Sequence, residues 1–248
     1  YQCNRTVLVD ELNKQYATVD AHEKVRSNID LLLQDNCYTI CTAHQPNIFT
    51  GHLYFVYKII HAIKLADLLN EQVKDCCFVP VYYMGSEDAD LEELGEVFIN
   101  GKKYQWETKQ KGAVGRMKID KAFIEMIAAI EAQLSVELYG KEILALVKQC
   151  YTVGKTVQQA TFEFVHALFA DKGLIILLPD NAVLKSEFSN VVAKELEEQF
   201  SQKAVNETIA ALPGKYKVQV AGRDINLFYL KDDIRERIEQ TPSGFTIA

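Results

Sequence analysis

The sequence predicts an α/β fold in which a mostly parallel sheet is covered by helices. Three short apolar, β-prone runs, residues 38–42, 78–84 and 174–178, are separated by stretches with helical periodicity. Each run is followed by a loop and then by a helical pattern, as in parallel strands joined by helical crossovers. With 248 residues, 48% of them hydrophobic and 25% charged, the chain can form the core of one large domain or two small ones.

The first predicted strand lies between two predicted helices. Residues 20–33 carry apolar side chains on one side of a helix, and residues 38–42 then form an apolar run that we expect to be a buried strand. From Leu53 to about Leu69, apolar residues recur at helical spacing, which predicts the next helix. Thr50 is placed to cap that helix, with its hydroxyl accepting a hydrogen bond from a first-turn N–H.

The second predicted strand, residues 78–84, contains a proline. Because proline cannot donate to a β-ladder, we expect Pro80 to lie near the beginning of the strand. Further on, Asn100-Gly101 stands between two β-prone flanks and predicts a two-residue hairpin. Two helical stretches follow, covering roughly residues 121–149 and 157–170.

The third predicted strand, residues 174–178, follows Gly173, a residue typical of a helix end. The remaining predicted elements are a helix over residues 182–200 and two β-rich segments, 216–220 and 225–230. The chain begins at Tyr1 rather than at a methionine and stops shortly after a β-rich segment. We therefore expect it to be a piece of a longer protein.

Three loops are the first places to search for a site, because ligands of parallel sheets bind beyond the C-terminal ends of the strands. These loops are residues 43–51, 85–90 and 179–181. In the first, a strand leads into a helix whose N-terminus favours anions, and Gly51 lets a phosphate or carboxylate approach the backbone. His44 and His52 can donate a proton, or a hydrogen bond to charge that develops in a transition state. The structural alternative is that His52 caps a helix turn and that His44 is a satisfied loop histidine.

The four residues Phe49-Thr50-Gly51-His52 resemble the HxGH signature of class I nucleotidyltransferases and class I aminoacyl-tRNA synthetases. The histidines of those enzymes contact ATP phosphates, and Phe49 stands where the first histidine usually does. The second ATP signature of the same enzymes, a KMSKS-type loop, is not found within the 248 residues.

The second loop carries three carboxylates, Glu87, Asp88 and Asp90, at the end of a predicted strand. They could bind a substrate ammonium group or a divalent ion, or act as a base if burial raises a pKa. A structural role is also open, because Asp90 and Glu93 have the spacing of a capping box and acidic residues complement a helix N-terminus. Capping alone does not require Glu87 and Asp88, and we therefore favour a functional role for the cluster.

Arg116, in the glycine-bearing sequence GAVGR, could clamp a carboxylate with two hydrogen bonds, which arginine does better than lysine. An exposed loop arginine is the alternative. GAVGR lacks the spacing of a dinucleotide fingerprint or a P-loop, and the sequence has no GxSxG nucleophile elbow. The six cysteines form no CxxC pair, so that we expect no metal site.

Composition excludes several classes of partner. The formal net charge is −7, which argues against a nucleic-acid ligand. No apolar run reaches the roughly 20 residues needed to span a bilayer, and no basic-then-apolar signal stands at the start, so we expect neither membrane insertion nor export. Scattered cysteines fit reduced thiols in the cytoplasm.

Several motifs taken together resemble the BshC family, identified as cysteine ligases of bacillithiol biosynthesis. They are a THQ-type loop, an FTG turn, an LYxxYK helix start, the strand end VPVYYMGSEDAD and the downstream INLFYL. The first two together are far more specific than either alone, and the resemblance runs from about Thr39 to Arg237. The matching residues are Thr42 to Pro46, Phe49 to Gly51, Leu53-Tyr54, Tyr57-Lys58, Val79 to Asp90 and Asn226 to Phe228.

The resemblance implies a Rossmann-like core with inserted connecting segments, in a bacterial cytoplasmic enzyme. Residues 1–248 would be an incomplete Rossmann-like core, and residues 95–155 an inserted segment containing the hairpin and helices. Family members are roughly twice as long and end in a helical coiled-coil region that supports homodimers. That region is absent from these 248 residues.

The reaction that the resemblance implies joins L-cysteine to glucosaminyl-malate through an amide bond. Since amide formation from a free carboxylate is uphill in water, ATP with Mg²⁺ is the candidate co-substrate by analogy with class I synthetases. The residues assigned to catalysis are His44, His52 and Asp88. The residues assigned to substrate binding are Thr42, Gln45, Asn47, Thr50, Gly51, Glu87, Asp90 and Arg116.

In this scheme the first loop holds the phosphate of the activated carboxyl, while the acidic cluster receives the cysteine ammonium or takes a proton from the sugar amine. The sequence departs from the family in two places. His52 replaces a proline that commonly follows FTG, and Ala89 replaces the histidine of an EDHD pattern. Two other readings stay open: a class I nucleotidyltransferase-like enzyme with another substrate, and a catalytically silent nucleotide-binding module.

Overall fold

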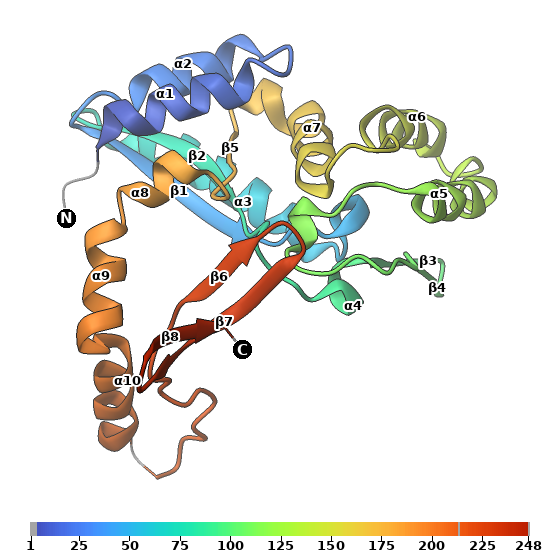
Figure 1. The fold of residues 1–248 in the computed structure, drawn as a ribbon. Coiled ribbons are helices and arrows are strands. Elements are labelled where there is room, and N and C mark those ends of the chain that lie inside the picture. Colours follow the sequence, from blue (N-terminus) through green and yellow to red (C-terminus); the bar gives the residue numbers. More distant parts are fainter. Residues whose placement is uncertain (1–3, 213, 248) are drawn as a thin grey trace.

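The computed structural model describes residues 4–212 and 214–247 and confirms the α/β fold (Figure 1). Its central sheet has the order β1-β2-β5 in the described part of the chain, and both pairings are parallel. The strands are β1 (Cys37–His44), β2 (Cys77–Met84) and β5 (Ile175–Leu177). Because the strands are parallel, their C-terminal ends meet at one edge of the sheet.

Three helices before the second strand cover this sheet: α1 (Arg5–Tyr16), α2 (Glu23–Leu31) and α3 (Tyr54–Gln72). α3 packs along β1 and β2, and α2 packs against β2 and β5. Helix α1, which the sequence did not predict, protects the outer edge of β5. The Tyr16 hydroxyl accepts a hydrogen bond from Ile176 N at 2.7 Å, and Gln15 Nε2 donates to Ile176 O at 2.8 Å. These side chains satisfy backbone groups that a further strand would otherwise pair.

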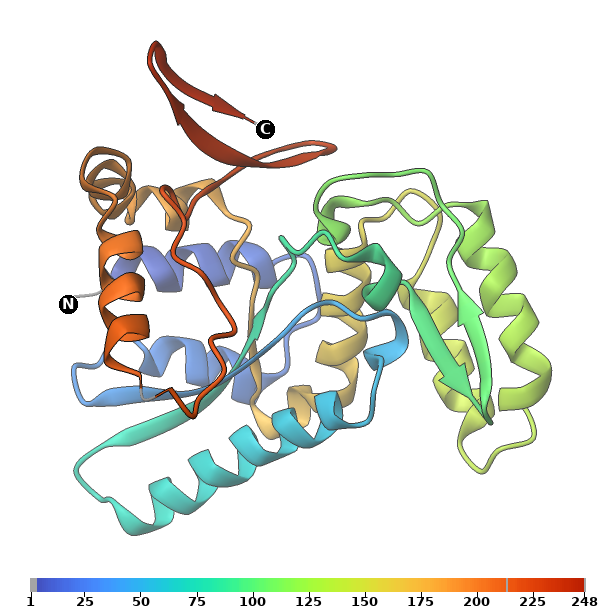
Figure 2. The same ribbon diagram turned by 90° about the horizontal axis from the view of Figure 1, so that it is seen from below.

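The elements that form a second hydrophobic cluster lie beside the sheet (Figure 2). Its elements are α4 (Leu91–Leu94), β3 (Glu96–Ile99), β4 (Lys102–Gln105), α5 (Lys121–Leu134) and α6 (Gly140–Cys150). The predicted two-residue turn is confirmed, because Ile99 pairs with Lys102 while Asn100 and Gly101 both have positive φ. The assignment of residues 95–155 as an inserted segment stays a prediction.

Helix α7 (Val157–Phe169) joins the two clusters. Its Phe162 and Val165 belong to the first hydrophobic cluster, which the sheet forms with α1, α2 and α3, whereas Ala160 and Phe164 belong to the second cluster. After α7, Gly173 adopts the left-handed conformation expected at a helix end, with φ 74°. The two clusters are thus held against each other by one buried helix.

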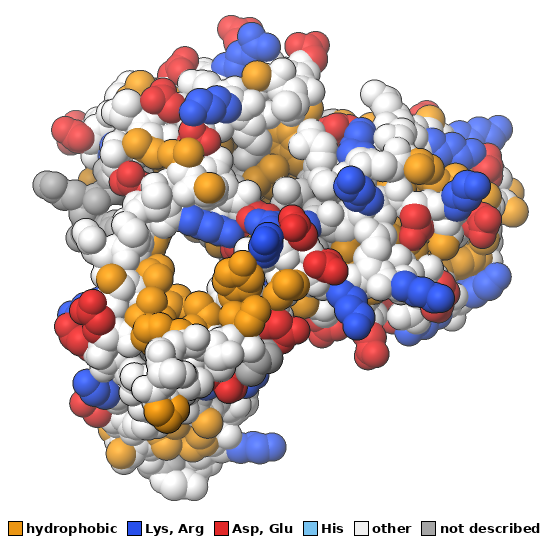
Figure 3. Space-filling view, in the orientation of Figure 1, with side chains coloured by type: hydrophobic (Ala, Val, Ile, Leu, Met, Phe, Trp, Pro, Cys, Tyr) orange, Lys and Arg blue, Asp and Glu red, His pale blue; other side chains and the backbone are white. Residues whose placement is uncertain are grey.

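The described residues after Leu178 form an arm. None of them belongs to either hydrophobic cluster. Its helices are α8 (Ala182–Ser186), α9 (Ser189–Glu198) and α10 (Phe200–Ala211), and its antiparallel strands are β6 (Phe228–Lys231), β7 (Ile234–Thr241) and β8 (Gly244–Ile247). The space-filling view shows a hollow between the sheet region and this arm, with hydrophobic side chains gathered along it (Figure 3). None of the described helices combines the length and apolar character needed to cross a membrane.

Four expectations were wrong in detail. β1 is not a buried strand: it lies at an edge of the sheet, and Cys37 is its one buried residue. Pro80 is the fourth residue of β2 and does not lie at its beginning. Its lack of an N–H is tolerated because the pairing of β2 with β5 starts only at Val81. The helix predicted over residues 182–200 is divided among α8, α9 and α10, and residues 216–220 contain no strand.

Candidate functional site

The loops after β1 and β2 are in direct contact. The parallel register pairs His44 with Met84, so both strands end at the same level. Gly85 N donates to His44 O at 2.8 Å, and Gln45 Nε2 donates to Asp88 Oδ2 at 3.1 Å. The histidine loop and the acidic loop therefore form one continuous surface at the C-terminal edge of the sheet.

After β1 the chain makes a strained turn, η1 (Ile48–Thr50). Phe49, Thr50 and Gly51 have φ of 52°, 72° and 58°, a left-handed conformation that costs non-glycine residues free energy. The Phe49 ring compensates by packing against Phe123 and Tyr151, with centroid distances of 5.7 and 5.3 Å. Strain of this kind persists only where the surrounding packing imposes it, and it is enriched at functional sites.

This turn overturns the prediction that Thr50 caps the following helix. α3 begins at Tyr54 with Leu53 as its N-cap, and no side chain makes a capping hydrogen bond. The left-handed turn places Thr50 three residues before the cap position, which leaves its hydroxyl outside the helix.

His44 is half-buried at the end of β1, with its ring 5.1 Å from that of Tyr54 and 5.4 Å from that of Phe55. Burial lowers the pKa of His44, although a hydrogen bond to the Gln45 carbonyl oxygen opposes the shift. A neutral imidazole can accept a proton at one nitrogen while the other nitrogen is held by a hydrogen bond. His52 is exposed and stacks on Tyr54, at 5.7 Å between ring centroids.

A pocket of about 300 Å³ opens between η1 and β3. It is lined by Asn47, Thr50, Gly51, His52, Leu53, Glu93, Glu96, Val97 and Phe98. Asn47 is 2% exposed, and its Oδ1 has no hydrogen-bond partner among the described residues. Gly51 has to be glycine here, because a Cβ would lie 2.7 Å from the Cβ of Asn47 and φ is positive.

Glu93 and Glu96 are pocket residues that the sequence analysis did not assign to the site. Glu96 forms an ion pair with Lys103 of β4, whereas the Glu93 carboxylate has no hydrogen bond or ion pair within the described ranges. Glu93 was considered only as a member of a capping box. Glu93 lies well after the predicted strand end in the sequence, and nothing in the sequence indicated that it would face the η1 turn.

The carboxylates of the acidic loop are mostly used within the loop itself. Asp88 Oδ1 accepts hydrogen bonds from Ala89 N at 2.7 Å and Asp90 N at 3.3 Å, and its Oδ2 accepts the bond from Gln45. Asp90 caps α4 by accepting from Glu93 N at 3.1 Å, as the capping-box spacing predicts. Asp88 therefore holds the two loops together.

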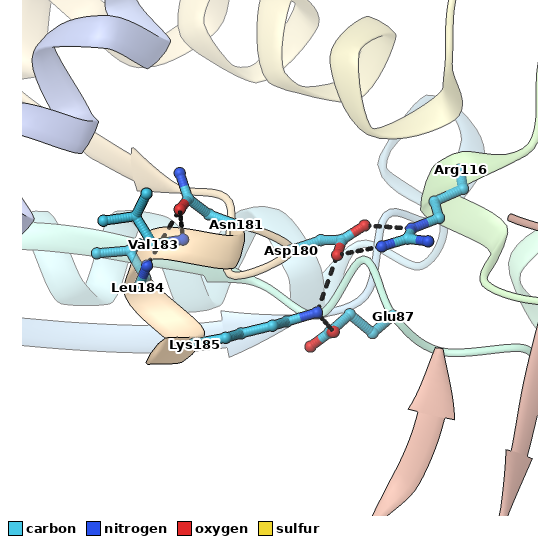
Figure 4. A network of polar contacts seen from close by, with 7 residues as sticks. All are labelled: Glu87, Arg116, Asp180, Asn181, Val183, Leu184 and Lys185. Atoms are coloured by element: carbon cyan, nitrogen blue, oxygen red, sulfur yellow. Dashed lines mark hydrogen bonds and ion pairs between the residues drawn. The ribbon is translucent and has the colours of Figure 1, made fainter. Parts of the chain in front are cut away.

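Glu87 belongs to an ion-pair network that joins three loops (Figure 4). Arg116 donates two hydrogen bonds to the Asp180 carboxylate, from Nε at 2.6 Å and from Nη2 at 2.8 Å. Lys185 Nζ lies 2.9 Å from the same carboxylate and also pairs with Glu87. Arg116 thus clamps a carboxylate with two bonds, as its chemistry allows, but the carboxylate belongs to the chain's own Asp180.

Asp180 and Lys185 are members of this network that were not among the predicted site residues. Burial would raise the pKa of Asp180, but hydrogen bonds from Arg116 and Lys185 hold it below its ordinary value. The GAVGR loop is fixed on the same side, because Val114 N donates to Asp88 O at 2.7 Å and Gly115 N donates to Ser86 O at 2.9 Å.

Other features complete the surroundings. Thr42 is half-buried in β1 opposite Tyr82, two residues before His44. An apolar pocket of about 240 Å³ adjoins the polar one, and the two share Gly51, Val97 and Phe98. Within residues 4–212 and 214–247 there is no group of three or more His, Cys, Asp or Glu side chains able to hold a metal ion. The arrangement can offer an imidazole, acceptor oxygens and an apolar wall to one small ligand.

Known proteins are similar to this chain in sequence. The chain matches the family model described as "Bacillithiol biosynthesis BshC, N-terminal Rossmann-like domain" over residues 1–248. A protein of Cytophaga hutchinsonii is 40% identical over 245 residues, which are 98% of this chain and 45% of the relative. One of Flavobacterium johnsoniae is 40% identical over 235 residues, 95% of this chain and 44% of the relative.

A third relative, from Christiangramia forsetii, is 37% identical over 248 residues, 98% of this chain and 46% of the relative. All three bear the name "Putative cysteine ligase BshC". The chain spans about 45% of the length of the curated relatives it matches. By its match along the whole sequence, the chain belongs to the BshC family of bacillithiol biosynthesis, as the N-terminal Rossmann-like domain.

Proposed function

We propose that this chain is part of a C–N ligase that joins L-cysteine to glucosaminyl-malate by an amide bond. Family membership and the name of the relatives support a cysteine ligase. The supporting observation in the fold is the bond between Gln45 and Asp88, since it joins the two loops that carry the candidate residues. The same proposal places the protein in the bacterial cytoplasm, as a homodimer in its full-length form, with residues 95–155 as an inserted segment.

In this proposal the cysteine carboxyl is activated and the sugar amine attacks it. The attacking amine has to lose a proton, and His44 is the candidate base because burial favours its neutral form. Gln45 is held by Asp88, which pre-organises the loop on which His44 lies. Asp88 is thus proposed to act in catalysis by positioning, since its oxygens accept bonds from the loop itself.

ATP with Mg²⁺ is the proposed source of activation, because the reaction needs a leaving group on the carboxyl. The donors available to a phosphate are the Thr50 hydroxyl, the His52 ring and the amides at the start of α3. Mg²⁺ is commonly held by substrate phosphates with few protein ligands, which fits a site without a dedicated cluster of metal ligands in the described residues.

The test is bacillithiol formation in a strain that lacks the gene and is complemented with full-length variants. We expect His44→Ala to lower bacillithiol at least about a hundredfold, the lower end of the range for a lost general base, and Asp88→Asn to lower it about tenfold because it loosens the loop that carries His44. His61→Ala and Asp67→Ala, both exposed on α3, are the matched controls and should retain wild-type levels. Wild-type bacillithiol in both site variants, at equal protein abundance, would remove these residues from the mechanism.

The purified protein distinguishes the ligase from the two alternatives. A ligase should consume ATP and release AMP or ADP only when L-cysteine is supplied, either alone or together with glucosaminyl-malate. Turnover with another acid in place of cysteine would indicate a class I nucleotidyltransferase-like enzyme. Nucleotide binding without turnover would indicate a silent binding module.

A further inference from the structure

The two edges of the central sheet are protected to different degrees. At the outer edge of β5, side chains of α1 bond both the N–H and the C=O of Ile176. At the outer edge of β1, side chains bond only carbonyls near its two ends. Arg5 donates to Cys37 O at 3.1 Å, and Lys58 donates to Ala43 O at 2.5 Å. The middle of the β1 edge has no such protection within the described ranges.

The backbone groups in the middle of this edge are unpaired. Gly85 N donates to His44 O at 2.8 Å and continues the β1–β2 ladder, so the even-numbered residues of β1 direct their N–H and C=O groups toward β2. The odd-numbered residues Thr39, Cys41 and Ala43 direct theirs toward the open side. Their three N–H groups, and the C=O groups of Thr39 and Cys41, make no hydrogen bond among the described residues.

The sequence of β1 is typical of a covered strand rather than of an open edge. Native proteins protect open edges with charged residues, prolines or bulges, because an open edge can pair with any extended segment. The eight residues of β1, CYTICTAH, contain no proline, aspartate, glutamate, lysine or arginine, and their register with β2 is unbroken. The side chains of Thr39, Cys41 and Ala43 are exposed on the sheet face away from α3, whose Phe55 contacts the His44 ring on the other face. One edge and one face of this apolar strand are thus bare.

We propose that a β-strand from the part of the full-length chain beyond residue 248 pairs in parallel with β1. The chain spans about 45% of the length of its curated relatives and matches a domain described as N-terminal, so more than half of a full-length member is available to supply the strand. A strand of the same chain suits an edge without charges, because it covers that edge whenever the protein is folded. The parallel orientation follows both other pairings of the sheet. The inference rests on family membership and not on the proposed reaction.

The added strand changes the place of the candidate site in the sheet. β1 becomes an interior strand, as its apolar sequence predicts. From β1 the described chain passes through α3 to β2, so a strand on the other side of β1 reverses the direction in which the sheet grows. Ligands of open α/β sheets bind at the C-terminal ends of the strands where this reversal occurs. The loop after the added strand therefore lies beside His44 and adds residues of its own to the candidate site.

Hydrogen–deuterium exchange of the full-length protein, resolved to single amides, tests whether the edge is covered. The amides of Ile40 and Thr42 face β2 and are the internal controls, which should exchange slowly in either case. We expect the amides of Thr39, Cys41 and Ala43 to exchange at least about a hundredfold more slowly than in an unstructured peptide, as hydrogen-bonded amides of a stable sheet do. Exchange of these three amides at the unprotected rate, beside slow controls, would overturn the inference.

Photo-cross-linking of the full-length protein identifies the segment that covers the edge. The photoreactive p-benzoylphenylalanine replaces Thr39 or Ala43 in separate variants, because both side chains are exposed next to the open edge. We expect cross-links within the monomer band of a denaturing gel, to peptides beyond residue 248. The Ala43 probe should reach about four residues further along that segment than the Thr39 probe, as a parallel register requires. A probe at Tyr139, exposed between α5 and α6, is the control and should not reach the same segment.

Each contrary result points to a different state of the edge. Cross-links confined to the dimer band would assign the edge to a second copy of the chain and overturn the inference. Cross-links to residues before 248 of the same chain would assign it to the arm, with the same consequence. A reversed order of the two contact points would exclude the parallel pairing. None of these results bears on the ligase proposal, because bacillithiol formation is measured separately.

Discussion

Two neighbouring regions at the edge of the sheet differ in whether their charged and polar groups are paired within the protein. In the ion-pair corner (Glu87, Arg116, Asp180 and Lys185), each charged group has a partner of opposite sign. In the η1 pocket (Asn47, Glu93 and Glu96), a buried amide oxygen and an exposed carboxylate make no hydrogen bond or ion pair of their own within the described ranges. A complete network fixes loops in place, whereas a buried acceptor without a donor lowers the stability of the fold.

The two regions also differ in how the backbone forms them. The ion-pair corner joins three loops that are separated along the chain, with Arg116 and Asp180 64 residues apart. The η1 pocket is formed around three consecutive residues with positive φ, held by the Phe49 ring. One region therefore stabilises the fold, and the other stores strain that the fold has to support.

The largest expected effect is on the ion-pair corner. Arg116→Met leaves Asp180, whose side chain is 6% exposed, with only Lys185 beside it, and should lower the free energy of unfolding by about 2–3 kcal/mol. The estimate is at the low end for a buried pair because Arg116 is 30% exposed. Urea denaturation followed by the fluorescence of Trp106, the single tryptophan, measures this change.

A matched control and a pH series sharpen that measurement. Lys148→Met breaks an ion pair with Glu131 whose two side chains are both 46% exposed, and should cost less than about 1 kcal/mol. Because the pKa of Asp180 is lowered in the fold, its contribution is present above the unfolded value of about 3.9 and is lost as the pH falls through the folded value. A difference between wild type and Arg116→Met that stayed constant down to pH 2 would contradict this.

The second largest effect concerns the strained turn. Gly51→Ala should destabilise the protein by about 2 kcal/mol, because the new Cβ would meet Asn47 and the backbone has φ 58°. Gly101→Ala is the control: it also has a positive φ but has open space around it, so about 1 kcal/mol is expected. Equal costs in thermal denaturation would mean that the packing of Asn47 against Gly51 contributes nothing.

A smaller effect, of opposite sign, is expected within the η1 pocket. Asn47→Leu replaces a buried unpaired amide oxygen by an apolar group of similar shape, and should stabilise the ligand-free protein by about 1 kcal/mol. Destabilisation by this substitution, measured by chemical denaturation, would show that the amide is satisfied in solution.

The smallest effect concerns the proton of His44. Burial lowers its pKa, so an NMR titration should place the midpoint below the ordinary value of about 6.5, with His44→Gln identifying the signal. The stabilising contribution of the neutral ring is complete above that value and decreases as the pH falls below it. We expect a change of less than about 1 kcal/mol, and a midpoint at or above 6.5 would remove the argument for His44 as a base.

Local signals in the sequence predicted much of the fold. The apolar runs identified β1, β2 and β5, and Asn100-Gly101 identified the β3–β4 turn, because strand and turn preferences act over a few residues. Helix α1 was missed, since its mixed polar and apolar residues show no strong period and its role depends on β5, more than 150 residues away. The predicted cap at Thr50 was wrong because the packing of Phe49 overrides the local preference.

Some residues of the candidate site could likewise be predicted from the sequence, and others could not. His44, Gln45 and Asp88 could be named from the sequence because polar residues directly after parallel strands face one edge. Asp180 could not be recognised as the partner of Arg116, nor Glu93 as a wall of the η1 pocket. Such pairings depend on where separate segments meet in space.

By itself, the sequence determined the parallel α/β core, the two loops that meet at its edge and the family to which they belong. Only the tertiary structure decided which charges are neutralised by ion pairs within the protein and which are not. The physical reason is that a strand or a turn follows from short-range backbone and side-chain preferences. The pairing of a charge follows from burial and from distances across the fold, to which segments far apart in the chain contribute together.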